Sequence, residues 1–254
     1  MGGEVEDSHL SGQRHPSAVY DIGGYVLAGG KSSRMGRDKA LVELAGKPLV
    51  LRAVLKLRRI CADVAIAGGD ASLDMFAPVV VDIHPGCGPL SGIEAALAHS
   101  THDWNLFLPI DMPLMPSAVL ETCFVGVALK TLPALAAIVH TVDGRDQPLC
   151  AIYHRALLPF IQEALAAGRY KLMPVVREAA RRLAVERKHE GRPLLWNAAY
   201  ASDTVEIGAP ALAEGTIFER VTPEQLAARP LWFANLNTPE DLALAAAHAD
   251  ALED

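Results

Sequence analysis

The first two thirds of the chain alternate between short apolar runs and segments with helical spacing. The apolar runs cover residues 25–28, 64–67, 79–81 and 104–109. Each run stops at glycines or close to an aspartate, as buried strands do where they enter tight loops. Between them, apolar residues recur at helical spacing from Pro48 to Ile60, and a second helix is expected over 91–98. This alternation predicts an α/β fold with a parallel sheet covered on both faces, and ligand sites at the carboxyl ends of its strands.

The pattern is less regular beyond residue 130. Residues 135–140 and 149–153 are typical of strands, and 155–167 predict a helix that ends at a glycine. Residues 180–230 are rich in Arg, Ala, Gly and Pro and support no assignment. The segment 237–240 predicts a final helix, with Asn237 or Thr238 as its cap and a proline in the first turn.

Composition narrows the classes of protein that fit. A chain of 254 residues that is 51% hydrophobic and 21% charged is typical of a folded domain; we expect a disordered leader over 1–20 and a single domain over 21–254. The net charge of −7 argues against a nucleic-acid partner. The four cysteines form no C-x-x-C pair, which favours a reducing cytoplasm over a disulfide framework or a zinc site. The apolar runs are too short to cross a bilayer, so no membrane association is expected.

A glycine-rich loop follows the first apolar run. It reads L-A-G-G-K-S-S-R-M-G-R-D-K over residues 27–39. Glycines let backbone N–H groups approach phosphates closely, Arg34 offers a fork of donors, and Lys39 adds a compact positive charge. Neither the Walker spacing nor the G-x-G-x-x-G fingerprint is present. The loop therefore indicates triphosphate binding of another kind.

Acidic residues follow two other strands. Asp111 comes after the run 104–109, where a carboxylate near a triphosphate is what Mg²⁺ needs, although an aspartate that caps a turn before Pro113 fits the sequence as well. Asp82 comes after the run 79–81. Next, Gly88 and the residues after it lead into a helix whose first N–H groups are free to meet a ligand.

The loop over 27–39 resembles the L-A-G-G-x-S-x-R-M-G-x-D-K signature of the molybdenum cofactor guanylyltransferases. Residues 111–113 are similar to the D-x-P segment of that family, and 88–92 to its G-P-L-x-G segment. The resemblance implies a Rossmann-like three-layer sandwich of the nucleotidyltransferase type, with a mostly parallel sheet. It implies Mg²⁺-dependent transfer of GMP from GTP to the terminal phosphate of molybdopterin, which releases pyrophosphate. A nucleotide-binding part over about 21–125 and an acceptor-binding part over about 126–254 are expected.

The resemblance also implies three kinds of site residue. Catalytic roles fall to Arg34, Lys39 and Asp111, of which Asp111 holds the metal. Nucleotide contacts are expected from Leu27, Ala28, Gly29, Gly30, Ser33, Met35, Gly36, Lys39, Ala67, Asp82, Gly88, Pro89, Leu90 and Gly92. Acceptor contacts are expected from Asp146, Gln147, Pro148, Arg169, Asn235 and Asn237. For Arg169, a position at a solvated helix end fits the sequence at least as well as an acceptor contact. For the two asparagines, capping of the final helix is the first interpretation and acceptor contact the second.

One departure keeps other functions open. Ala67 stands where the guanylyltransferases often carry an asparagine, so another group, such as Gly68, Gly69 or Asp70, would have to contact guanine. A cytidylyltransferase or a sugar-phosphate nucleotidyltransferase is the first alternative, and a non-catalytic nucleotide-binding partner is the second. Residues 181–230 form a longer connection than the family usually needs. Partner candidates are a molybdenum-insertion protein or an apoenzyme chaperone.

Overall fold

The computed structural model describes residues 19–29, 38–130, 136–188, 195–200 and 220–253. Its main sheet has seven strands within these ranges, in the order β5-β4-β1-β6-β8-β7-β9. The strands are β1 (Tyr20–Leu27), β4 (Cys61–Ala67), β5 (Val79–Val80), β6 (Trp104–Pro109), β7 (Ala137–Val142), β8 (Arg145–His154) and β9 (Leu195–Tyr200). Neighbouring strands pair in parallel except at β8, which is antiparallel to both β6 and β7. A separate antiparallel pair joins β2 (Glu43–Leu44) and β3 (Lys47–Pro48).

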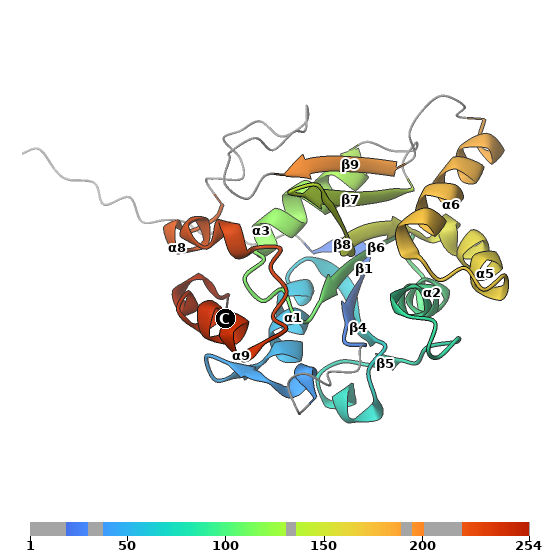
Figure 1. The fold of residues 1–254 in the computed structure, drawn as a ribbon. Coiled ribbons are helices and arrows are strands. Elements are labelled where there is room, and N and C mark those ends of the chain that lie inside the picture. Colours follow the sequence, from blue (N-terminus) through green and yellow to red (C-terminus); the bar gives the residue numbers. More distant parts are fainter. Residues whose placement is uncertain (1–18, 30–37, 131–135, 189–194, 201–219, 254) are drawn as a thin grey trace, which may run out of the picture.

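Helices cover both faces of the sheet (Figure 1). One face is covered by α2 (Pro89–His99), α5 (Leu158–Ala166) and α6 (Leu172–Glu186). On the other face lie α1 (Leu49–Arg58), α3 (Ser117–Val119), α4 (Gly126–Lys130), α8 (Pro223–Ala227) and α9 (Pro239–Ala246). The predicted three-layer α/β sandwich with a mostly parallel sheet is therefore confirmed. No helix among the described residues combines the length and the apolar character needed to span a membrane.

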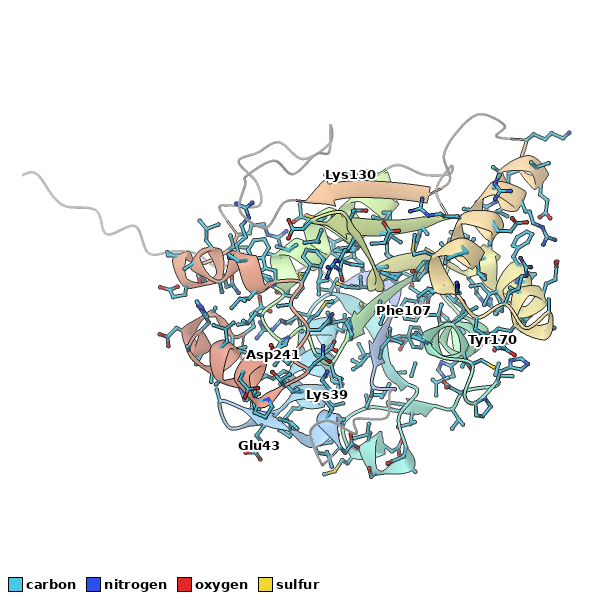
Figure 2. The ribbon with its side chains drawn as sticks, viewed as in Figure 1. Lys39, Glu43, Phe107, Lys130, Tyr170 and Asp241 are labelled. Atoms are coloured by element: carbon cyan, nitrogen blue, oxygen red, sulfur yellow. The ribbon has the colours of Figure 1, made fainter. Side chains whose placement is uncertain are left out.

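Alternation along the central strands divides the interior into two cores. Successive side chains of a strand point to opposite faces. In β6, Leu106 and Leu108 pack with α1, whereas Phe107 faces the layer of α2 and α5. Phe107, labelled in Figure 2, stacks on Tyr25 with ring centroids 5.4 Å apart and meets Tyr153 edge-on at 5.6 Å. This row of aromatic rings ties β1, β6 and β8 together on one face.

The start of the first strand was predicted wrongly. β1 begins at Tyr20, not at Tyr25, because Gly23 and Gly24 belong to the strand although they break its apolar run. A Cβ on Gly23 would lie 2.5 Å from Asn105 Oδ1, so the close approach of β6 explains the glycine there. The expected leader overlaps this strand at Tyr20, whose hydroxyl donates to Glu121 at 2.7 Å, while residues 1–18 lie outside the described residues.

Two elements within or next to the unassigned segment become visible. α6 buries a stripe of small and branched side chains, among them Val176, Ala179 and Leu183, against the α2–α5 layer. β9 pairs in parallel with β7. Val176, Ala179 and Leu183 recur at helical spacing, so the sequence carries a signal for α6 that the prediction did not use.

Candidate active site

A cavity of about 810 Å³ opens at the carboxyl ends of β1, β4 and β6. Its walls contain most of the predicted nucleotide-binding residues: Leu27, Ala28, Gly29, Lys39, Ala67, Asp82, Gly88, Pro89 and Gly92. Asp111 and Asn237 also line it. Small-molecule sites in α/β sheets occur at this edge, and a volume of this size is typical of them.

The strongest polar cluster in the cavity is formed by Lys39, Asp111 and Asn237. Lys39 Nζ donates to Asp111 Oδ2 and to Asn237 Oδ1, each at 2.9 Å. The Lys39 and Asp111 side chains are only 15% and 21% exposed, so water weakens their attraction less than it does for a surface pair. Lys39 begins a short 3₁₀ turn that Asp38 caps by accepting the Ala40 N–H at 2.9 Å.

Capping of α9 brings Asn237 to this cluster. Thr238 is the N-cap, and its hydroxyl accepts the Asp241 N–H at 3.1 Å. In return, Asp241 Oδ2 accepts the N–H groups of Asn237 at 2.8 Å and Thr238 at 2.9 Å. The Asn237 N–H group contributes most to holding the pKa of Asp241 below its usual value. In Figure 2, Lys39 accordingly lies next to the C-terminal segment that carries Asp241.

Asp82 lines the same cavity, and its Oδ1 would lie 3.6 Å from a Cβ on Gly68. Its Oδ1 is buried and has no hydrogen-bond partner within the described part of the chain. Burial, and secondly the charge of Glu94, raise the pKa of Asp82. Glu94 itself is fully buried and accepts from His84 Nδ1 at 2.8 Å. This bond ties the loop that carries His84 to helix α2.

Two glycines at neighbouring strand ends give the cavity a wall of bare backbone. A Cβ on Gly29 would lie 3.0 Å from Gly68 O, and one on Gly68 would lie 3.2 Å from Gly29 Cα. Gly68 also has a φ of +76°, which L-residues with side chains rarely adopt. Both the conformation and the close approach therefore require glycine at position 68.

We expect Gly68→Ala to lower the free energy of unfolding by about 1–2 kcal/mol, because the new methyl group meets backbone and the left-handed conformation becomes strained. Urea unfolding measures the loss. Gly126→Ala is the control: Gly126 has a helical φ of −59°, so alanine there should raise stability slightly. Equal effects of the two substitutions would contradict this account of Gly68.

One of the other predicted nucleotide contacts is not part of the cavity wall. Leu90, in α2, is fully buried in the core and does not line the cavity. Gly30, Ser33, Met35 and Gly36, and the predicted catalytic residue Arg34, lie outside the described residues. The cavity includes Gly68, which the sequence had offered as a substitute contact for guanine, and adds four residues that were not predicted: Gly86, Pro109, Ile110 and Leu149. The sequence offered one clue to these residues: each lies within two positions of a residue that was predicted, namely Ala67, Gly88, Asp111 or Pro148.

Most predicted acceptor contacts are not brought to this cavity. Asp146 accepts from Thr141 Oγ1 and from Arg177, each at 2.8 Å, so its charge is already paired. Pro148 uses its carbonyl to accept the Tyr153 hydroxyl at 2.7 Å. The other three that are absent from the cavity walls are Gln147, Arg169 and Asn235.

The donor set of the site suits a hard cation only in part. Asp111 Oδ1 is buried without a hydrogen-bond partner among the described residues, while its Oδ2 faces Lys39. The same residues contain no group of three or more His, Cys, Asp or Glu side chains able to hold a metal by themselves. Any metal here would need oxygen ligands from a substrate in addition to the protein.

Comparisons with known proteins agree with this geometry. Residues 24–186 match the family described as MobA-like NTP transferase domain. The molybdenum cofactor guanylyltransferase of Serratia proteamaculans is 35% identical over 163 residues, which are 60% of this chain and 78% of that protein. The enzyme of the same name from Vibrio atlanticus is 38% identical over 160 residues, 60% of this chain and 79% of that protein.

A solved structure shares the fold. Molybdopterin-guanine dinucleotide biosynthesis protein A from Archaeoglobus fulgidus superposes with a TM-score of 0.61 at 23% identity, covering 89% of this chain and 97% of its own. The sequence match covers the cavity-lining residues from Leu27 to Leu149, including Asp111, but not Asn237. The chain belongs to the family of MobA-like NTP transferases.

Proposed function

We propose that the protein transfers GMP from GTP to the terminal phosphate of molybdopterin, forming molybdopterin guanine dinucleotide and pyrophosphate. The relatives named molybdenum cofactor guanylyltransferase support this reaction. The observation that carries the proposal is the cluster of Lys39, Asp111 and Asn237 in a cavity that Gly29 and Gly68 also line. One cavity thus offers a cation, a carboxylate and glycine backbone, the combination that triphosphate chemistry uses.

In this proposal the triphosphate lies against Gly29 and Lys39. An ammonium group has three N–H donors, and Asp111 and Asn237 accept two of them, so a third remains for a phosphate oxygen. Arg34 is proposed to add a second cation from the loop outside the described residues. Asp82 is proposed to contact the nucleoside, because a carboxylate accepts the N–H or O–H donors of a base or sugar. Charge neutralisation and positioning then supply the catalysis, since the attacking acceptor phosphate is already anionic and needs no general base.

We propose Mg²⁺ as the metal of this site, with Asp111 as its protein ligand. The buried, unpartnered Oδ1 of Asp111 supports this, because Mg²⁺ is usually bound by one or two carboxylates together with substrate phosphates. When bound, the ion supplies positive charge to the phosphate oxygens. Lys39 then shares Asp111 with the metal and keeps the carboxylate oriented.

The remaining expectations follow the same assignment. Cavity residues before position 125 form the proposed nucleotide-binding part, and the acceptor-binding part contributes Leu149 and Asn237. The four unpaired cysteines support the proposed location in a reducing cytoplasm. A molybdenum-insertion protein or an apoenzyme chaperone is the proposed partner for delivery of the product.

Nucleotide choice tests the proposal most directly. With Mg²⁺ present, we expect GTP to raise the melting temperature more than CTP, ATP or UTP. At about 100 times Kd, binding adds about 2.7 kcal/mol, which is about 5–10 °C for a domain of this size. Differential scanning fluorimetry of the four nucleotides in parallel measures this, with free guanosine as the control for the triphosphate. A larger shift with CTP would replace the guanylyl assignment with a cytidylyl one, and would show that Ala67 leaves guanine without its partner.

A further inference from the structure

Three cationic side chains of helix α1 and its C-terminal end contact other segments of the protein: Arg52, Lys56 and, just after the helix, Arg59. Arg52 and Lys56 are each only 4% exposed. Removing a charge from water is costly, so a buried cation persists where main-chain or carboxylate acceptors compensate for the lost hydration. The acceptors therefore reveal which segments these cations hold.

The three cations contact three parts of the chain, two of them sharing Glu253. Arg52 donates to Leu44 O at 2.9 Å and Ala45 O at 3.1 Å, where β2 turns into β3, and more weakly to Glu253 O at 3.5 Å. Arg59 pairs with the Glu253 carboxylate at 3.5 Å. Lys56, in contrast, reaches the loop that follows β6.

Lys56 contacts the main chain of residues that follow Asp111 in the sequence. Its Nζ donates to Pro113 O at 2.8 Å and also to Met115 O. Inside the loop, the Met112 N–H meets Pro109 O at 3.4 Å and the Met115 N–H meets Met112 O at 3.3 Å. Two carbonyls that follow Asp111 thus converge on one buried amine, which sets the path of the main chain.

The C-terminal segment also forms a hydrogen bond with this loop. The Leu236 N–H donates to Asp111 O at 3.0 Å, next to the Asn237 side chain that binds Lys39. The main chain at Asp111 is therefore fixed from two directions, by α1 through Lys56 and by the C-terminal segment through Leu236. Lys56 itself does not line the cavity formed by the described residues.

We infer that Lys56 is a positioning residue for nucleotidyl transfer, which acts by holding loop 111–115 so that the Asp111 carboxylate faces the cavity. The inference rests on the proposed function. It predicts that loss of Lys56 lowers kcat more than it changes KM for GTP, because Lys39 and the backbone of Gly29 and Gly68 still line the cavity.

The test compares Lys56→Met with Arg52→Met in the full-length protein. Both remove a buried cation from the same helix, but the main acceptors of Arg52 lie on the β2–β3 turn, away from Asp111. For Lys56→Met, we expect kcat per folded molecule to fall about 10- to 100-fold and KM for GTP to change less than about threefold. Arg52→Met should keep the kcat of the wild-type protein, although both variants unfold at lower temperature.

Amide hydrogen exchange gives a readout that does not require turnover. We expect faster exchange over residues 111–115 in Lys56→Met and unchanged exchange there in Arg52→Met. If Lys56→Met cannot be purified as a folded protein, Lys56→Gln replaces it, with a smaller loss of kcat in the same direction. Wild-type kcat in the Lys56 variant would overturn the inference, and so would a lower kcat without faster exchange. A wild-type protein that releases no pyrophosphate from GTP would instead overturn the proposed function, and the exchange comparison would still decide whether Lys56 holds the loop.

Discussion

Replacing Asp111 by asparagine is expected to slow pyrophosphate release about 100- to 1000-fold while the fold stays intact. The substitution keeps the shape of the side chain but removes the negative charge that faces Lys39 at 2.9 Å and that is proposed to hold Mg²⁺. The main-chain bond from Leu236 to Asp111 O is unaffected, so the loop keeps its anchor. The free energy of unfolding should change by no more than about 1 kcal/mol, as for a partly exposed ion pair.

The measurement is pyrophosphate release with GTP and molybdopterin over a range of Mg²⁺ concentrations, alongside thermal unfolding. Asp250→Asn, which removes an exposed carboxylate near the C-terminus, is the control and should be as active as the wild-type protein. Activity of Asp111→Asn within a factor of ten of wild type would remove the metal assignment. A loss of cooperative unfolding would instead give Asp111 a structural role.

Lys39→Met is expected to reduce pyrophosphate release by about 100-fold or more and to raise KM for GTP, because it removes a positive charge from the phosphate end of the cavity. It also leaves Asp111 Oδ2 and Asn237 Oδ1 without the donor they now share. Asn237→Ala keeps the charge and removes one of its two acceptors, so a smaller loss of about tenfold is expected.

The double variant separates two roles for Asn237. If Asn237 acts through Lys39, then Lys39→Met combined with Asn237→Ala should be no slower than Lys39→Met alone. If Asn237 contacts the acceptor, as the family resemblance implies, the two losses should multiply. Steady-state kinetics of the four proteins with GTP and molybdopterin decide between these outcomes.

Local sequence signals predicted the parts of the fold that depend on local structure. The strand at 104–109 and the helix start at Pro239 were predicted as observed, because an apolar run and a capping pattern are properties of adjacent residues. The start of β1 was missed because position 23 must be glycine to leave room for Asn105 on the neighbouring strand. Loss of the apolar run there reflects a contact between strands, which one segment cannot reveal.

In the candidate site, too, local motifs were predicted from the sequence, whereas contacts between distant segments were not. The glycine loop and Asp111 could be found from their own motifs, and the structure brings Gly29, Lys39 and Asp111 to one cavity. The G-P-L-x-G motif did not reveal that Leu90 faces the core, since a motif does not specify the buried face of a helix. The partner of Asp146 was equally hidden, because Arg177 lies 31 positions away on α6, a helix that was not assigned from the sequence.

The distance along the chain between Lys39 and Asn237 affects how the protein matures. The two residues are 198 positions apart, and every strand of the described sheet precedes Asn237. During synthesis, domains form from the N-terminal side as the chain leaves the ribosome. A nascent chain that has completed β9 therefore carries the sheet and Lys39 but lacks the amide that holds this lysine, so the cluster is completed only after Asn237 has been synthesised.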